Sequence, residues 1–321
     1  MAGLYPRVVG FLKRKEQVFT ACWFVSLFCS TAIAQSPKVQ LELKGEAVRI
    51  KVGEREVGLY EFGNQEILRP FFSNLKTPNG MQVTRSHPPG AGDSDDHATM
   101  HPGVWIAFGD ISGDDFWRNK ASVRHQGLTI KDPLASGAAG FVQQKDYVSK
   151  SGAVLCSEIF DCSILTAGND LQLVFDISFG SKVGCYFGDQ EEMGLGVRVA
   201  TQITEKAGGI LRDSEGRTGA KQIWSRAAAW CDYAGEVEGQ PVGVTLFCHP
   251  ENFRSSWFHA RNYGLMVANP FGRKAMKKGA RSKVRIDSGE TLRLRYAVWL
   301  HGKATAAEID AAFERYLTAA Q

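Results

Sequence analysis

Leu171-Gln172-Leu173-Val174-Phe175-Asp176-Ile177-Ser178-Phe179 alternates apolar and polar residues over most of its length. This period of two is typical of a β-strand that buries one face in a core. The same pattern recurs at 292–298, and in the stretches 39–43 and 48–52 on either side of a Gly45-Glu46 turn. Those two stretches and their turn predict a β-hairpin.

Apolar runs and one helical pattern complete the coarse picture. The runs 242–247 and 264–268 lack a polar alternation and predict more deeply buried strands. Thr305 and Glu308 form a capping-box pattern, followed by an apolar stripe at helical spacing that consists of Ile309, Phe313, Tyr316 and Leu317. Many strands without helices between them predict stacked antiparallel sheets. We therefore expect an all-β, mainly antiparallel fold with one C-terminal helix, in a single large domain over 35–321.

The composition fits an ordinary globular protein. Of the 321 residues, 44% are hydrophobic and 22% are charged, which excludes disordered and collagen-like chains. The net charge of +4 is mild, and no nucleic-acid motif accompanies it, so we expect no nucleic-acid partner. A local basic excess is interpreted as a solvated loop and strand edge, with an anionic partner as the alternative; it comprises Arg273, Lys274, Lys277, Lys278, Arg281, Lys283 and Arg285. No assembly pattern predicts an oligomeric state.

The first 34 residues have the pattern of a signal peptide. A positive region precedes the uncharged, mostly apolar run 18–34, which ends in the small-x-small motif Ala32-Ile33-Ala34. A cleaved signal is favoured over a retained anchor because the apolar part is short for a bilayer span. We expect a mature chain that begins at Gln35, has no integral membrane segment, and is exported to the periplasm or the extracellular space.

Cysteine spacing does not indicate a disulfide framework. Five cysteines follow the predicted signal peptide, an odd number without CxxC spacing: Cys156, Cys162, Cys185, Cys231 and Cys248. Cys156 and Cys162 are interpreted as buried apolar residues, with a disulfide between them as the alternative.

A first constellation in 95–117 combines carboxylates, imidazoles and indoles. His97 and His101 are four residues apart, a spacing that ligates a metal when both lie on one helical face. Pro102 follows at once, so a loop entering a strand is expected and no metal site is predicted. An acid/base or hydrogen-bonding role is favoured, with Asp96 orienting His97, while a structural role stays open. Further candidates here are Trp105, Asp110 and Trp117.

A second constellation pairs Glu192 with Arg198. The two are six residues apart and therefore share one face of an extended strand. Facing a cavity, they would bind and deprotonate a hydroxylated ligand; a buried ion pair that holds two sheets in register is the equal alternative. The Gly194-x-Gly196 between them is not followed by a helical pattern, so no dinucleotide cofactor is expected.

The third constellation, 249–263, is rich in polar and aromatic groups: His249, Asn252, Trp257, His259, Arg261 and Tyr263. Trp257, His259 and Arg261 share strand parity. Aromatic rings suit the C–H faces of sugars, and the polar groups suit their hydroxyls. The alternative is that Trp257 and Tyr263 belong to the core and that His249 closes a turn.

These blocks together resemble the family labelled "methane oxygenase PmoA". The motifs are Arg69-Pro70-Phe71-Phe72, Asp96-His97 through Trp117, Glu192-x-Gly194-x-Gly196-x-Arg198, Trp230-x-Asp232-Tyr233, His249-Pro250-x-Asn252, Trp257-x-x-x-Arg261-x-Tyr263-Gly264 and Asn269-Pro270-Phe271-Gly272. The block after Asp96 lacks the adjacent histidine pair of the family. The resemblance implies an exported β-supersandwich of the galactose-mutarotase type, with a sugar-facing sheet that carries His and Glu.

The leading hypothesis is an exported carbohydrate-active enzyme that performs acid/base chemistry on a sugar, with hydrolysis, elimination and epimerisation open. Its catalytic candidates are His97, His101, Glu192, His249 and His259. Its substrate-binding candidates are Asp96, Trp105, Asp110, Trp117, Arg198, Asn252, Trp257, Arg261 and Tyr263, and neither metal nor cofactor is expected. The alternatives are a non-catalytic glycan-binding protein and, less favoured, a metal-dependent oxygenase as the label suggests.

Overall fold

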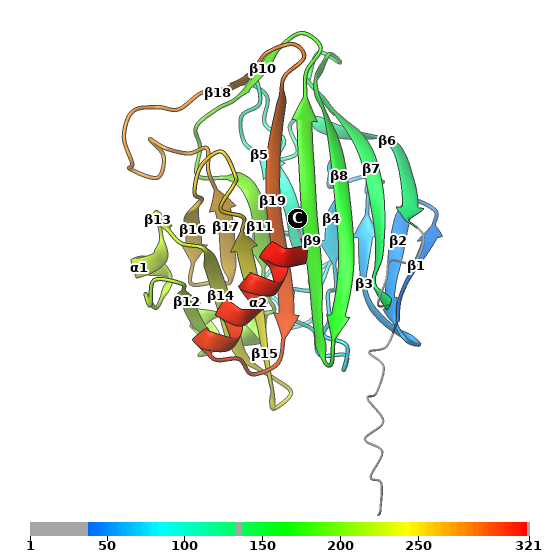
Figure 1. Ribbon diagram of the computed structural model, residues 1–321, viewed down its shortest axis with the longest axis vertical. Helices are drawn as coiled ribbons and strands as arrows, with labels where there is room; N and C mark the ends of the chain where they lie inside the picture. Colours follow the sequence, from blue (N-terminus) through cyan, green and yellow to red (C-terminus); the bar gives the residue numbers. More distant parts are fainter. Residues whose placement is uncertain (1–37, 132–136, 320–321) are drawn as a thin grey trace, which may run out of the picture. The chain divides into compact units, whose positions relative to one another are not determined.

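Two antiparallel sheets pack face to face and enclose the main core (Figure 1). The computed structural model describes residues 38–131 and 137–319; the predicted signal peptide and its cleavage site lie outside the described residues. The predicted all-β, mainly antiparallel supersandwich with one main C-terminal helix is therefore confirmed.

The nine-stranded sheet, counted over the described residues, has the order β1-β2-β3-β4-β5-β11-β17-β16-β13. Its strands are β1 (Val39–Lys44), β2 (Ala47–Val52), β3 (Arg55–Glu61), β4 (Phe71–Ser73), β5 (Val104–Phe108), β11 (Met193–Arg198), β13 (Arg226–Ala227), β16 (Trp257–Arg261) and β17 (Leu265–Asn269). The predicted hairpin is β1 paired with β2, in a register that joins Val39 to Val52 and Lys44 to Ala47.

The eight-stranded sheet, counted in the same way, has the order β12-β14-β15-β19-β9-β8-β7-β6. Its strands are β6 (Ser122–Lys131), β7 (Ala139–Val148), β8 (Val154–Ala167), β9 (Asp170–Gly180), β12 (Ile210–Asp213), β14 (Trp230–Val237), β15 (Gln240–Cys248) and β19 (Thr291–His301). The alternating stretch 171–179 lies in β9 and turns Leu171, Leu173, Phe175, Ile177 and Phe179 into the core. A small ribbon joins β10 (Cys185–Phe187) to β18 (Val284–Ile286).

The C-terminal helix α2 (Ala306–Ala319) covers the outer face of the eight-stranded sheet, which lies in front in Figure 1. Its predicted capping box is confirmed, because Glu308 accepts from the Thr305 N–H at 2.7 Å and donates its own N–H to Thr305 Oγ1 at 3.3 Å. The predicted stripe packs on Phe247 and Trp299. None of the helices in the described part of the chain is long and apolar enough to cross a membrane.

The shorter helices were not predicted. They are α1 (Ala220–Ile223), η2 (Thr201–Ile203) and η3 (Glu205–Ala207), all in the connection between β11 and β14. Each is too short to show an apolar stripe in the sequence. All five cysteines after residue 37 are buried free thiols.

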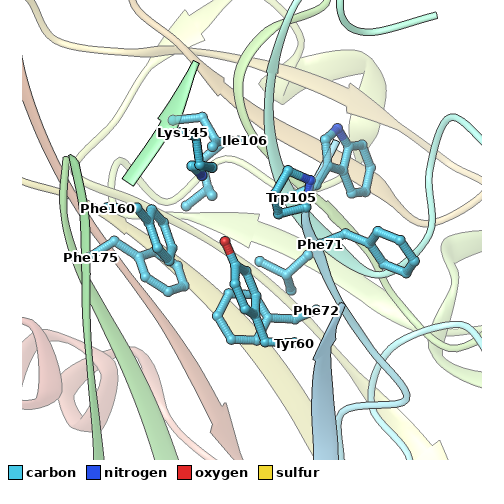
Figure 2. A pocket seen from close by; sticks show the side chains of 11 residues that line it. Tyr60, Phe71, Phe72, Trp105, Ile106, Lys145, Phe160 and Phe175 are labelled. Carbon is cyan, nitrogen blue, oxygen red and sulfur yellow. The ribbon is translucent and has the colours of Figure 1, made fainter. Parts of the chain in front are cut away.

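The interior between the sheets also holds a charged pair. Lys145 of β7 lies directly opposite Glu158 of β8, with 2.8 Å between Nζ and Oε1, and both side chains are almost fully buried. Tyr147 donates a hydrogen bond to Glu158 at 2.7 Å. Figure 2 shows the neighbouring small cavity, where Tyr60, Phe160 and Lys145 line the same space.

The other face of the nine-stranded sheet carries a separate apolar layer around Trp105 and Trp117. This layer exists because glycines make room for it. A Cβ on Gly196 of β11 would lie 2.6 Å from Trp105 Cζ2, so the indole lies against bare backbone. The loops 85–103 and 109–121 and the β16–β17 hairpin bring polar side chains to this same face, and there we place the candidate site.

Candidate functional site

A column of four aromatic rings forms the centre of the candidate site. Neighbouring rings are nearly parallel: Tyr263 to His97 at 6.1 Å and 15°, His97 to His101 at 4.9 Å and 23°, and His101 to Trp105 at 5.2 Å and 13°. Trp117 closes the side of the column, edge-on to Trp105 at 5.3 Å. The structure therefore brings together five residues that the sequence placed in two separate constellations.

A chain of polar contacts orients the exposed end of this column. Arg198 of β11 holds Asp96 with both terminal nitrogens, at 2.7 and 3.2 Å. Asp96 in turn contacts His97 Nδ1 at 3.1 Å. Partial burial raises the pKa of Asp96, but hydrogen bonds from Arg198, Ser94 and His97 outweigh it and leave that pKa well below the usual range. Asp96 is thus a charged acceptor that fixes the imidazole of His97, whose side chain is 42% exposed.

Arg85 builds the loop that carries Asp96 and His97. Its guanidinium is buried and donates to the carbonyl oxygens of Ser94, Asp96 and His101 at 2.7 to 2.9 Å. Within this loop His97 has a backbone φ of +54°, a left-handed conformation that few residues other than glycine adopt. Such a conformation persists where the surroundings impose it, and it concentrates at functional sites.

His101 lies deeper, at 3% exposure, and cannot readily take up a proton. Burial, followed by the neighbouring His97 and arginine charges, lowers its pKa to about 2. Its Nδ1 and the indole nitrogens of Trp105 and Trp117 are buried without a hydrogen-bond partner among the described residues. Most buried polar groups in folded proteins are hydrogen-bonded, so this layer keeps unused hydrogen-bonding capacity.

Arg69, at 2% exposure, ties this aromatic layer to the loops above it. It donates to the carbonyl of Trp117 at 2.9 Å, to Asn119 Oδ1 at 2.7 Å and to the carbonyl of Met100 at 2.6 Å. Burial lowers the pKa of Arg69 to about 9, which leaves it charged at neutral pH. The early Arg69-Pro70 motif therefore positions both loops of the site.

A second carboxylate group lies beside the column, on the loop before β11. Glu191 Oε2 accepts from Arg261 at 2.9 Å and lies 3.2 Å from His259 Nδ1, although that ring is not aligned for a hydrogen bond. The His259 ring lowers the pKa of Glu191, as does the Arg261 guanidinium, against the effect of partial burial. Phe258 and Ala260 face the core, so the predicted shared side of Trp257, His259 and Arg261 is confirmed.

Asn269 and Gly272 hold the Glu191 loop in place. Asn269 is fully buried and donates to the carbonyls of Gln190 and Glu191 at 2.8 and 2.9 Å. A Cβ on Gly272 would lie 2.2 Å from the Gln190 carbonyl oxygen, so only glycine allows this approach. The Asn269-Pro270-Phe271-Gly272 motif thus shapes the site from behind.

Glu192 and Arg198 do not pair with each other. Glu192 precedes β11 and bonds to Arg118 of the 109–121 loop, whereas Arg198 bonds to Asp96. The alternative of a buried Glu192–Arg198 ion pair is therefore wrong, while the expectation that both act on a ligand stays a prediction. The parity argument failed because Glu192 is outside the strand on which it depended.

Tyr263 packs against two basic side chains at the end of the column. It lies in the turn between β16 and β17, with the Arg198 guanidinium 4.5 Å from its ring centroid and the Lys206 ammonium 6.0 Å away. Burial raises the pKa of Tyr263, and the charges of Asp96 and Glu192 act in the same direction.

Three sequence candidates lie elsewhere. His249 follows β15 and packs edge-on to Tyr316 of α2 at 5.7 Å, on the eight-stranded sheet. Asn252 is buried in the same turn, where it exchanges hydrogen bonds with the Arg295 backbone at 2.9 and 2.7 Å. Asp110 accepts from Gly113 N–H in a turn after β5. The sequence neighbourhood of His249 and Asn252 suggested a site because the chain crosses from one sheet to the other within 249–257.

Four residues of the site were not among the predicted candidates: Arg69, Arg85, Arg118 and Glu191. Arginines in loops resemble any solvated surface, and only the fold shows that Arg69 and Arg85 are buried. Glu191 had a weak indication, because it adjoins Glu192. Over the described ranges, no three His, Cys, Asp or Glu side chains converge as a metal-binding group would require.

Comparison with solved structures gives distant matches. GH36 alpha-galactosidase AgaB from Geobacillus stearothermophilus is 10% identical, with a TM-score of 0.44 over 83% of this chain; the chain spans 41% of that galactosidase. Galactose 1-epimerase from Lactobacillus acidophilus NCFM is 9% identical, with a TM-score of 0.40, over 84% of this chain and 100% of the epimerase. No curated protein sequence matches the chain.

The predicted PmoA membership is wrong. The family that matches residues 47–314 is described as a "Family of unknown function (DUF6807)", and nothing in the comparisons indicates PmoA. The misassignment rested on the order of short motifs, which several of the contacts above explain as packing requirements of the sheet, as with Gly196 and Gly272. The chain, matched over most of its length, belongs to the DUF6807 family.

Proposed function

We propose that the protein is an exported carbohydrate-active enzyme that performs acid/base chemistry on a sugar at the outer face of the nine-stranded sheet. The observation that carries this proposal is the chain Arg198–Asp96–His97, which ends in a half-open imidazole at a strained backbone position. A carboxylate that fixes one ring nitrogen leaves the other free to exchange a proton with a ligand.

Several further contacts support a sugar as the ligand. The Tyr263 ring is partly exposed, and aromatic rings pack on the C–H groups of sugars. Arg198 and Arg261 lie close enough to Tyr263 to act on its charge state, and they can bind hydroxyl or developing oxyanion groups. Glu192, 30% exposed beside Arg118, is the second carboxyl of the proposed reaction.

Export remains part of the proposal and depends on the pattern of residues 7–34. Mass spectrometry of the protein recovered from its native host tests it. We expect a mature chain that begins at Gln35. If all of the protein recovered from the host instead begins upstream of residue 18, the predicted cleavage is refuted.

A proton NMR time course with pooled oligosaccharides tests the reaction, because it detects epimerisation and elimination as well as cleavage. We expect new anomeric or olefinic signals with wild-type protein, at least about a hundredfold slower with His97→Ala, as for the loss of a general acid or base. Glu192→Gln is expected to be similarly slow. His125→Gln, on the far edge strand β6 of the other sheet, is the matched control and should retain full turnover.

A non-catalytic glycan-binding protein is the second candidate, favoured by one observation. Asp96 and Glu191 each bond to an arginine, which lowers their pKa values and stabilises them as charged acceptors rather than as proton donors. In that case the sugar signals broaden without new signals, and Glu192→Gln changes affinity but yields no change in product. Turnover by wild-type protein would reject this candidate.

A further inference from the structure

A cavity next to the candidate site has an unexplained excess of positive charge. It measures about 360 Å³ and is lined by Glu205, Ala220, Lys221, Trp224, Ala260, Arg261 and Asn262. Arg261 is shared with the candidate site, where it bonds to Glu191. A ligand bound over Tyr263 can therefore extend into this cavity past Arg261.

Trp224 is the principal ring of the cavity. Its side chain is half-buried, and its indole nitrogen is buried without a partner among the described residues. Two cations lie by the ring: Lys277 Nζ at 5.3 Å and the Arg261 guanidinium at 6.0 Å from the centroid. A half-buried aromatic ring with flanking cations suits a ring-shaped ligand that carries an anionic group.

The loop that supplies Lys277 is held by buried contacts. Asp189, at 6% exposure, accepts backbone N–H groups from Lys274, Ala275 and Ser282 at 2.7 to 2.9 Å. Ser225, one residue after Trp224, donates to the carbonyl of the fully buried Met276. Lys277 follows at a φ of +56°, so its place beside Trp224 is built into the fold. Lys277 is exposed, as the sequence interpretation of this loop expects, and the loop's basic character is the feature for which an anionic partner was the alternative.

The local charge is not balanced. Lys221, Arg261 and Lys277 lie around Trp224, whereas Glu205 is the carboxylate of the cavity lining and Glu191 bonds to Arg261. Glu205 accepts the Ala220 N–H at 3.1 Å. Over the described part of the chain, neither Lys221 nor Lys277 has a carboxylate within ion-pair distance. Two cations are thus available to a ligand.

We propose that this cavity binds an anionic sugar unit, which bears a carboxylate or a sulfate, next to the unit that occupies the candidate site. The inference rests on the proposed function, because it extends the same ligand. The sugar ring would lie on Trp224, and its anionic group would contact Lys221 and Lys277. Exposed lysines recognise either anion as compact point charges, so the two sources are separated by experiment.

Isothermal titration calorimetry with three matched pools tests the inference. The pools are hexuronate trisaccharides, the neutral trisaccharides made by reducing their carboxylates to alcohols, and the neutral pool carrying sulfate esters. We expect an anionic pool to bind more tightly than the neutral pool, and this preference to shrink with added NaCl, which screens exposed charges. Whichever anionic pool binds more tightly identifies the anion.

The double variant Lys221→Met/Lys277→Met should weaken the preferred anionic pool about tenfold and leave the neutral pool unchanged, since two charge-assisted contacts are lost. Both lysines are exposed, so folding is not at risk. The control is Lys38→Met/Lys44→Met, which removes the same charge at β1, the opposite edge of the sheet.

Each outcome decides one claim. Equal binding of neutral and anionic pools, or a preference that survives the Lys221/Lys277 change, overturns the anionic subsite and leaves the proposed function standing. A loss of preference with the control pair also overturns it, because net charge would then be the cause. No binding of any pool by wild-type protein refutes both the subsite and the carbohydrate function.

Discussion

Single glycines determine how closely the site's aromatic layer approaches the sheet. Trp105 contacts the backbone of β11 at Gly196, and the loop before β11 passes over Gly272 at less than a normal Cβ contact. Neither glycine here is a turn residue; each leaves space for a partner. The Gly-x-Gly of 194–196 therefore has a packing function and no connection with nucleotide binding.

Gly196→Ala should destabilise the protein by about 1–3 kcal/mol, because the added methyl would lie 2.6 Å from Trp105 Cζ2 and force the indole off its position. Urea unfolding measures the change. Gly127→Ala on β6 is the control, since a Cβ there meets nothing within 4 Å, and it should stay near wild type. Equal stabilities for the two variants would contradict the packing role.

At this scale the sequence predicted residue types better than residue partners. His97, Asp96, Trp105 and Tyr263 were identified because imidazoles, carboxylates and aromatic rings cluster in two short segments. Their partners were not, because Arg198 is 102 residues from Asp96 and because the nearby Arg85 binds carbonyl oxygens of a loop without a periodic pattern. The backbone conformation of His97, which depends on Arg85, was equally outside what a local pattern can predict.

Among the elements, the cross-strand pair of β7 and β8 has a direct energetic consequence. Lys145 and Glu158 are opposite each other and buried, and burial lowers the pKa of Lys145. Removing either charge leaves the other without its partner in an apolar interior, which costs about 3–5 kcal/mol.

Lys145→Met and Glu158→Gln should each destabilise strongly, whereas the double variant should lose less than the sum of the two. The double variant removes both charges, and glutamine still accepts from Tyr147. A double-mutant cycle in urea measures the coupling. Strict additivity would show that the pair contributes no interaction of its own.

Helix α2 and the strands were predictable because each has its own characteristic spacing of apolar residues along the sequence. The α2 stripe and capping box, the β1–β2 hairpin and the alternation of β9 are local patterns that the structure confirms. The failure of the Glu192–Arg198 argument has the same origin. The alternation of side chains between two faces holds only within a strand. Because β11 begins at Met193, it does not apply to Glu192.

For the whole molecule, stability should fall as the pH drops below neutral, before the carboxylates titrate. Burial lowers the pKa values of His87, His101, His125 and His249, that of His101 to about 2. The unfolded chain takes up protons at these rings near pH 6.5 while the folded chain does not, so acid favours unfolding from there downward. Asp96, Glu191 and Asp232 have lowered pKa values, so their contribution is lost below about pH 4.

Urea unfolding at a series of pH values from 7.5 to about 4 tests this linkage. The free energy of unfolding should decrease between pH 6.5 and 5, and His101→Leu should reduce that slope because one proton-binding ring of the unfolded chain is removed. A flat profile down to pH 4.5 in the wild-type protein would contradict the assignment of neutral, buried histidines.

The order of the strands within each sheet could not be predicted from the sequence. β5 pairs with β11 although about half of the eight-stranded sheet lies between them in the chain, and β19 pairs with both β9 and β15. These contacts depend on surface complementarity between distant segments, which local periodicity does not encode. The same limit applies to the site, because some of its residues precede the strands that lie between β5 and β11 and others follow them.

The geometry of Trp105 and Trp117 gives the molecule an internal optical reporter. Two indoles at 5.3 Å with planes inclined by 69° couple their electronic transitions, and such a coupled, chiral pair gives a pronounced near-ultraviolet circular dichroism band. Because both rings belong to the layer beneath His101, the difference between the wild-type and Trp117→Phe spectra gives the contribution of this layer, separate from those of the other tryptophans. A variant that loses turnover but keeps this contribution has lost its chemistry and kept its architecture.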